Sequence, residues 1–336
     1  MGKDVLSYNK LVARTRRLVR RYRVPLHWSR TKNEKFNVHT ICVLLVLFQI
    51  EQKDYRTFQG WLEIAPALGL KNVPHWTTVQ KAFARLPPRL IRKLMQLAGQ
   101  CTDRIAALDP TYYQLSNPSV GYCRRIGRDV RKDKLRKVSV VVTTRQKKVL
   151  DVYIKAKERH GTKDVPKLDR TIFKDRTTLA DKEFDAESFH QYIDDAGGRS
   201  IVPCRYADVP IWRTEGVHRK RLKRAGPSKK FRWRVASESN NSGVKRRFSP
   251  VLKGKTFQQQ KRDCYGKYLA YNLSRDCYLW RLNFLQSHLA HKLFISVILC
   301  RIDGTNVQVP SLSNEGARRT LIMGAGTVPL HVQQTS

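Results

Sequence analysis

The stretch Phe231-Arg-Trp-Arg-Val-Ala-Ser-Glu-Ser-Asn-Asn-Ser-Gly-Val-Lys-Arg-Arg-Phe248 places one carboxylate, Glu238, within a run of cationic side chains. Arg234 precedes this acid by four residues and Lys245 follows it by seven. Because positions four and seven apart share one face of an α-helix, the spacing predicts a helical face with an acid between two bases. Carboxylate oxygens bind hard divalent cations, and cationic side chains bind phosphate. The pattern is therefore typical of a site where a metal ion lies beside a phosphate.

The composition of the whole chain favours a polyanionic partner. Its 336 residues include 66 Lys and Arg against 27 Asp and Glu, which gives a net charge of +39 at pH 7. This excess favours nucleic acid binding over a solvated basic surface or a ribosomal-type scaffold. A hydrophobic content of 41% excludes a disordered basic tail. The seven Cys include no C-x-x-C pair, which favours free thiols in a reducing compartment over a disulfide framework or a zinc site.

The sequence predicts a cytoplasmic, nucleoid-associated protein without a membrane partner. The N-terminal Met-Gly-Lys-Asp lacks the apolar core of a signal peptide. The apolar runs Ile41–Phe48 and Leu293–Cys300 are too short to span a bilayer.

Residues 1–100 are predicted to form a helical, DNA-binding region. The basic segment Arg14–Arg23 could follow a phosphate backbone, and the apolar segments Val38–Ile50 and Tyr55–Leu68 predict helices. In His75–Leu86, Thr77 and Gln80 match a capping box, which predicts a helix that starts at residues 77–78 and stops at Pro87-Pro88. This arrangement is either a helix-turn-helix or an ordinary helical hairpin. A helix-turn-helix would present three polar side chains to DNA: Gln80, Lys81 and Arg85.

Residues 101–280 are predicted to form an α/β domain with a mixed sheet flanked by helices. The domain begins with a short apolar strand that ends at Asp109. Further strands are indicated by alternating β-branched residues, and helices by a period near 3.6. The predicted strands are 137–144, 148–154, 177–180 and 200–203, and the predicted helices are 164–174, 186–196, 231–247 and 257–275. A basic connection without assigned structure covers 205–230.

Two acids stand at the ends of predicted strands, and a third stands on a predicted helix. Asp109 and Asp181 each follow an apolar run, and Glu238 comes later in the chain. Ligand chemistry in α/β sheets collects beyond strand ends, so these three carboxylates are candidates for holding two divalent ions suited to phosphoryl transfer. The alternative is that each Asp is an ordinary turn or N-cap residue.

These residues resemble the three acidic blocks of the DDE transposases encoded by bacterial and archaeal insertion sequences. The segments Leu108-Asp109-Pro-Thr and Leu179-Ala-Asp181-Lys-Glu-Phe-Asp-Ala-Glu187 are similar to the first two blocks. The third block of the family has Tyr, two residues, Arg, three residues, Glu, six residues and Lys. This chain keeps those spacings, but Phe231 replaces the Tyr.

The resemblance implies an RNase H-like catalytic domain with a five-stranded mixed sheet. It implies that Asp109, Asp181 and Glu238 are catalytic and hold two Mg²⁺ ions, for which Mn²⁺ can substitute. The implied reaction is metal-dependent cleavage at transposon ends followed by strand transfer into target DNA. The implied partners are the terminal inverted repeats, the target DNA and a second copy of the chain.

Further residues are candidates for contact with DNA. Phosphate contacts are expected from Arg234, Lys245 and Arg246 in the third block, and from Arg124, Arg125 and Arg128 in a basic loop. Trp212 is a candidate for stacking on an unpaired base, with core packing as the alternative, whereas Trp233 is expected to pack in the core.

Two alternative functions stay open from the sequence. Phe231 and Ser249 depart from the family pattern, which is compatible with an inactive or domesticated transposase that only binds DNA. A metal-dependent nuclease without strand transfer would share the same acids. Residues 281–336 are predicted to be a C-terminal extension, poorly ordered from about 303.

Overall fold

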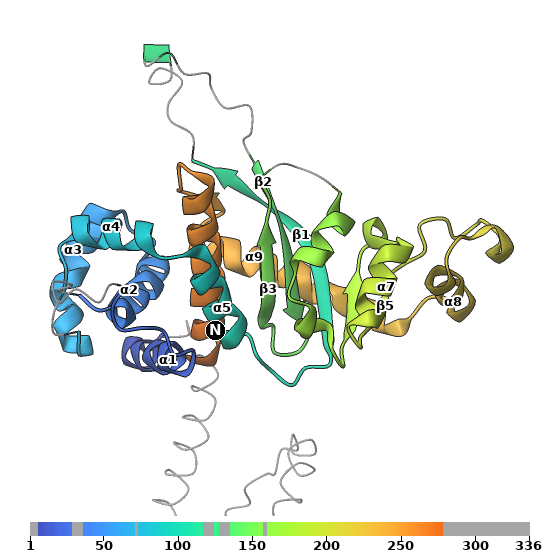
Figure 1. The fold of residues 1–336 in the computed structure, drawn as a ribbon, viewed down its shortest axis with the longest axis horizontal. Coiled ribbons are helices and arrows are strands. Elements are labelled where there is room, and N and C mark those ends of the chain that lie inside the picture. Colours follow the sequence, from blue (N-terminus) through green and yellow to red (C-terminus); the bar gives the residue numbers. More distant parts are fainter. Residues whose placement is uncertain are drawn as a thin grey trace, which may run out of the picture. The chain divides into compact units, whose positions relative to one another are not determined.

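The computed structural model describes residues 6–28, 36–70, 73–116, 124, 125, 127, 135–156 and 160–277. The predictions for Arg128 and for the extension 281–336, including its order from about 303, lie outside these residues. Within them, the chain is an α/β protein whose sheet mixes parallel and antiparallel strands and is flanked by helices, which confirms the predicted fold class at this level (Figure 1). None of the described helices is long and apolar enough to cross a membrane.

The sheet has the strand order β3-β2-β1-β4-β5, with β6 paired to β1. The strands β1, β2 and β3 are joined by antiparallel pairing, whereas β4 runs parallel to β1 and β5 parallel to β4. The predicted strands after residue 130 are confirmed. The bounds are β1 Ile105–Leu115, β2 Leu135–Thr143, β3 Val149–Ile154, β4 Thr177–Ala180, β5 Arg199–Ile201 and β6 Val251–Leu252.

The central strand β1 is longer than the sequence predicted. It continues past Asp109 to Leu115, where β6 pairs with its far end. The pairing of β4 with β1 stops at Leu108 and that of β6 starts at Gln114, so one edge of β1 has no strand neighbour in between among the described residues. A proline is tolerated in a strand with an unpaired edge, which explains why Pro110 does not end β1.

Helices precede the first strand. Their bounds are α1 Tyr8–Arg21, α2 Val38–Glu51, α3 Tyr55–Ile64 with a following 3-10 turn Ala65–Leu68, α4 Trp76–Arg85 and α5 Pro88–Ala98. The helices predicted over 38–50 and 55–68 are confirmed. The predicted start of α4 at 77–78 is wrong, because the His75 ring caps the helix two residues before Thr77, which lies inside it. The sequence also left α5 unassigned, although Pro88 suits the first turn of a helix.

The segment between β3 and β5 holds one predicted helix that forms and one that does not. The helix α7 Glu187–Asp195 agrees with the prediction. The helix predicted over 164–174 is replaced by two 3-10 turns, Gly161–Lys167 and Arg170–Phe173. Pro166 lacks the N–H that an α-helix needs there, and Asp169 starts the second turn by accepting from the Thr171 N–H.

The connection after β5 contains structure that the sequence analysis did not assign. The helix α8 Val217–Ala225 lies in it. A 3-10 turn, Lys229–Arg234, then leads into α9 Val235–Phe248, so the helix predicted from Phe231 begins four residues later. The final described helix covers 257–277, in agreement with the prediction for 257–275.

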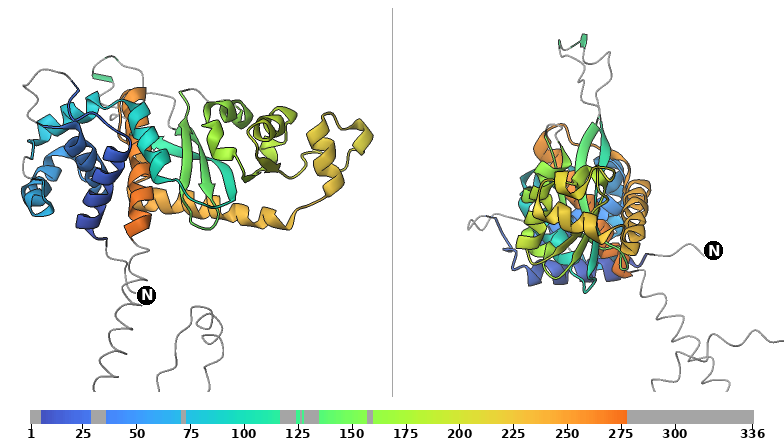
Figure 2. Two further views of the ribbon diagram at one scale, coloured as in Figure 1. Left: turned by 60° about the horizontal axis from the view of Figure 1, so that its bottom comes forward. Right: turned by 90° about the vertical axis from the view of Figure 1, so that its right-hand side faces the viewer.

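Alternate residues of the sheet face two hydrophobic cores. Ala107 of β1 belongs to a core that includes the N-terminal helices, α9 and helix 257–277, whereas Ala106 and Leu108 belong to a second core with α7 and the 3-10 turns. Helix 257–277 (orange in Figure 2) is hydrogen-bonded both to the N-terminal helical region and to the sheet. Arg262 Nε donates to the Leu86 carbonyl after α4, and the Asn272 amide bonds to the backbone of β3. The N-terminal helices and the sheet are thus joined through shared packing.

Candidate active site

Strand pairing brings Asp109 and Asp181 to the same level of the sheet. Leu108 of β1 pairs with Ala180, the last residue of β4, and each of the two acids is the next residue in its chain. Asp181 also begins the 3-10 turn Lys182–Phe184, where its Oδ1 accepts from the Lys182 N–H at 2.7 Å. The two carboxylates therefore come from neighbouring strands at the carboxyl end of β4, a usual place for a site in an α/β sheet.

Arg234 connects the first and third predicted acids. Its Nη1 lies 3.2 Å from Asp109 Oδ1, and its Nη2 lies 2.8 Å from Glu238 Oε1. Glu238 is in the first turn of α9, four residues after Arg234. The shared guanidinium brings an acid from the sheet and an acid from the helix to one place.

Asn241 holds the other oxygen of Asp109. Its Nδ2 donates to Asp109 Oδ2 at 3.1 Å, so each oxygen of that carboxylate accepts one hydrogen bond from the α9 region. Asn241 is buried, and its amide oxygen has no partner among the described residues. The neighbouring Asn240 is also buried, and neither of its amide atoms is partnered within the described part of the chain.

The three acids share one electrostatic environment. Burial raises the pKa of Asp109 above its ordinary value, and the charges of Glu238 and Asp181 raise it further, whereas Arg234 and the Asn241 hydrogen bond lower it. Burial lowers the pKa of Lys245, and the Asp109 carboxylate opposes that effect. The Lys245 Nζ also lies 5.7 Å from the centre of the Tyr113 ring, so this lysine faces β1, the strand that carries Asp109.

The three carboxylates suit a hard divalent cation, but two of them, Asp109 and Glu238, are now paired with the Arg234 guanidinium. Three carboxylates are ligands that Mg²⁺ and Mn²⁺ prefer. Over the described ranges, no group of three or more His, Cys, Asp or Glu side chains is close enough to hold a metal ion as it stands. The Arg234 guanidinium occupies the position between Asp109 and Glu238, so an ion bound there would have to replace its charge.

The predicted DNA contacts are distributed over several elements. Gln80, Lys81 and Arg85 are exposed on α4, Arg124 and Arg125 are exposed, and Arg246 is exposed on α9 close to Lys245. Trp212 is 73% exposed with the Arg213 guanidinium 4.6 Å from its ring centre, so core packing is wrong for it and stacking stays a prediction. Trp233 is 41% exposed, which contradicts its predicted place in the core.

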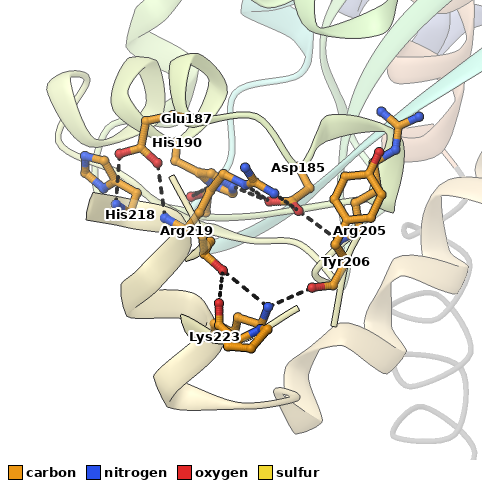
Figure 3. Close-up of polar contacts among 11 residues, drawn as sticks. Asp185, Glu187, His190, Arg205, Tyr206, His218, Arg219 and Lys223 are labelled. Carbon is orange, nitrogen blue, oxygen red and sulfur yellow. Dashed lines mark hydrogen bonds and ion pairs between the residues drawn. The ribbon is translucent and has the colours of Figure 1, made fainter. Parts of the chain in front are cut away.

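The sequence analysis did not identify the contacts that fix α8 against Asp185 and against Glu187 of α7 (Figure 3). Asp185 accepts from Arg219 Nε at 3.1 Å and from the Arg205 N–H at 2.8 Å. Glu187 accepts from the backbone N–H groups of His218 and Arg219 at the start of α8. The one sequence signal is Gly216, where a Cβ would lie 2.1 Å from the Glu187 carboxylate.

A buried Asp185–His190–Ser200 chain resembles a hydrolase triad only in residue type. His190 Nδ1 lies 2.8 Å from Ser200 Oγ, and its Nε2 lies 3.4 Å from Asp185 Oδ1. His190 and Ser200 are buried, so the hydroxyl is not presented to a substrate. These contacts fix α7 against β5.

Two cavities elsewhere in the chain are not lined by the three acids. The larger, about 650 Å³, lies between α5 and the turn Arg170–Phe173, where Lys93 pairs with Asp169 at 2.8 Å. The smaller, about 390 Å³, lies beside α4. No protein-family model matches the sequence, and no curated protein matches it.

Proposed function

We propose that the chain is a DDE transposase, which cuts DNA at the ends of its own mobile element and joins the freed 3′ ends to target DNA. The observation that carries this proposal is the convergence of Asp109 and Glu238 on Arg234, with Asp181 directly after the strand that neighbours that of Asp109. These are the three acids of the family pattern, and they come from distant parts of the chain.

The topology supports an RNase H-like catalytic domain over residues 101–280. Three antiparallel strands continue into two parallel ones in the order β3-β2-β1-β4-β5. The first acid lies on the central strand, the second follows β4, and the third lies on a helix after β5. The five strands and their flanking helices agree with the architecture that the resemblance implies, and β6 is an addition to it.

The chemistry of the site suits phosphoryl transfer. Asp109, Asp181 and Glu238 would hold two Mg²⁺ ions, with Mn²⁺ as a substitute. Such ions lower the pKa of an attacking water or 3′-hydroxyl and neutralise the leaving oxygen. The chain's own residues bind and orient: Arg234 and Lys245 clamp phosphate oxygens, and Asn241 fixes the direction of the Asp109 carboxylate.

DNA is the partner that the charge supports. The net charge of +39 and the exposed polar side chains of α4 fit a role of residues 1–100 in binding the terminal inverted repeats. Trp212, exposed beside Arg213, suits stacking on an unpaired base near the cut. The proposed working form is a homodimer that holds the two transposon ends together. Its proposed location is the cytoplasm, in association with the nucleoid.

The test uses the DNA that flanks the coding sequence on both sides. The purified protein is incubated with this DNA and with a pre-cut end in Mg²⁺, and the products are separated on a gel. We expect cleavage at the element end and joining of the pre-cut end to a target plasmid. Cleavage without joining would assign a nuclease, and specific binding without cleavage would assign a DNA-binding protein. Either result contradicts the proposed function.

A further inference from the structure

A groove lies between the N-terminal helices and the segment that follows β6. Its volume is about 390 Å³, and its walls come from α2, α3, α4 and residues 253–263. The floor is aromatic: the rings of Phe48 and Tyr55 are stacked at 4.7 Å, and Phe83 meets Phe48 edge-on at 5.6 Å. We refer to this feature as the α4 groove.

The rim of the α4 groove carries cations that are available to a ligand. Lys53, Lys253 and Lys255 line it, are exposed and have no ion-pair partner in the part of the chain that the structure describes. Arg262 also lines it, and its Nε donates to the Leu86 carbonyl at 2.6 Å. The rim therefore contributes four positive charges.

The two acids of the α4 groove are engaged within the protein. Asp54 caps α3, where it accepts from the Thr57 N–H at 2.9 Å and the Thr57 hydroxyl at 2.7 Å. Asp263 accepts from Gln49 Nε2 at 3.1 Å and from the Lys253 N–H at 2.8 Å. Four cations against these two carboxylates leave the charged residues that line the groove with a net charge of +2.

The segment that carries the lysines has a fixed backbone. The Lys253 N–H is held by Asp263, and a Cβ at Gly254 would lie 2.5 Å from the Gln260 nitrogen. The segment continues directly from β6, which pairs with β1, the strand of Asp109. A ligand on these lysines is thereby connected to the catalytic strand through sheet hydrogen bonds.

We propose that the α4 groove binds the phosphate backbone of the duplex that α4 contacts, so that the DNA interface continues from α4 onto residues 253–262. The inference rests on the proposed function and adds to it a second anchoring surface between the end-binding helices and the sheet. Gln80 of α4 lines the same groove, which makes the two surfaces continuous. The charge of the rim selects a polyanion, and the fixed backbone orders the lysines before binding.

The experiment compares a double variant in the groove with a double variant elsewhere. Lys253→Gln/Lys255→Gln removes two rim charges, and Lys163→Gln/Lys167→Gln removes two exposed lysines from the turn Gly161–Lys167. Binding of a labelled duplex taken from the flanking DNA is measured against NaCl concentration. Each neutralised phosphate contributes about −0.9 to the slope of log K against log salt. We expect the slope of the groove variant to be shallower than that of the wild-type protein by about 2, because two charges are removed. The control variant should keep the wild-type slope.

Equal slopes in the wild-type protein and both variants would overturn the proposal. Poly-glutamate binding that weakens in the groove variant, with the DNA slope unchanged, would assign the groove to an acidic protein and would also overturn it. Circular dichroism confirms that both variants are folded. Cleavage of the flanking DNA in Mg²⁺ is measured in parallel with the wild-type protein. If the wild-type protein cleaves but the groove variant keeps its salt slope, only the groove proposal is refuted. If the slope of the groove variant changes but the wild-type protein does not cleave, only the proposed transposase function is refuted.

Discussion

The guanidinium of Arg234 lies 3.2 Å from the carboxylate of Asp109, a residue 125 positions earlier in the chain. The same guanidinium pairs with Glu238, so one cation stands between two of the three proposed ligands of the divalent ions. An ion at this position and the guanidinium would compete for the same carboxylate oxygens. Arg234 is then free to bind a phosphate once the ion is present.

Replacement of Arg234 by Gln should strengthen divalent-ion binding while it weakens DNA cleavage. Two unit charges at 4 Å interact by about 1 kcal/mol in water and about 4 kcal/mol at an effective dielectric of 20. Removal of the competing charge should therefore lower the Kd for Mn²⁺ by about tenfold, which corresponds to about 1.4 kcal/mol. Calorimetric titration with Mn²⁺ measures this change. Arg232→Gln, an exposed neighbour, is the control. A Kd that is equal in the two variants would contradict the competition.

Two adjacent asparagines should respond in opposite ways to replacement by Leu. Asn241→Leu removes the hydrogen bond to Asp109, and hydrogen bonds to charged groups contribute about 1.5–3 kcal/mol to stability. The free energy of unfolding should fall by about that amount. Asn240→Leu removes buried polar atoms that have no partner in the described part of the chain, so it should be neutral or stabilising.

Urea unfolding without divalent ions measures both variants. Similar losses of stability in Asn240→Leu and Asn241→Leu would contradict the predicted contribution of the hydrogen bond from Asn241 to Asp109.

The contacts of Asp185 predict acid sensitivity. Burial raises the pKa of Asp185, but hydrogen bonds from His190, the Arg205 N–H and Arg219 lower it more, so the pKa lies well below its ordinary 3.8. Because the folded pKa is below the unfolded one, the ionised carboxylate contributes stability that is present above about pH 4 and is lost as the pH falls further. Asp185→Asn should lower stability at pH 7 and flatten its dependence on pH in the acid range.

Unfolding in urea at a series of pH values from 7 to 3 tests this prediction. Asp194→Asn, at a side chain that is 48% exposed and 3.6 Å from Arg221, is the matched control and should keep the wild-type slope. If the unfolding free energy of Asp185→Asn depends on pH as steeply as that of the wild-type protein, Asp185 does not cause the acid sensitivity.

Much of the sheet could be predicted because its strands carry local signals. The β-branched runs of β2, β3 and β4 alternate with turns, and the apolar runs before Asp109 and Asp181 predicted strands there. The strand β4 does end before Asp181, whereas β1 continues past Asp109. The full length of β1 could not be predicted, because past Pro110 it is held by non-local pairing, with β2 as far as Gln114 and with β6 at Gln114 and Leu115. The start of α4 was misplaced because His75, an uncommon cap, takes the position ahead of Thr77.

The parts of the site that the sequence analysis missed are stabilised by tertiary contacts. The helix α8 has no apolar stripe, and its start is held by Glu187 and Asp185 instead. The helical spacing correctly placed Arg234 near Glu238, but the bond from Arg234 to Asp109 requires the sheet and α9 to be packed together. The contact of Asn241 with Asp109 was not predicted, because an asparagine in a basic helix is most often exposed.

The most direct test of the account is the cleavage of the flanking DNA in Mg²⁺ by Asp181→Asn. Among the described residues, Asp181 is the proposed ligand without a bond to Arg234, which pairs with both Asp109 and Glu238. The control is Asp175→Asn, an exposed residue before β4 with φ +56°, a conformation that asparagine tolerates. We predict that Asp181→Asn abolishes cleavage and that Asp175→Asn cleaves like the wild-type protein. Undiminished cleavage by Asp181→Asn would contradict the three-carboxylate site.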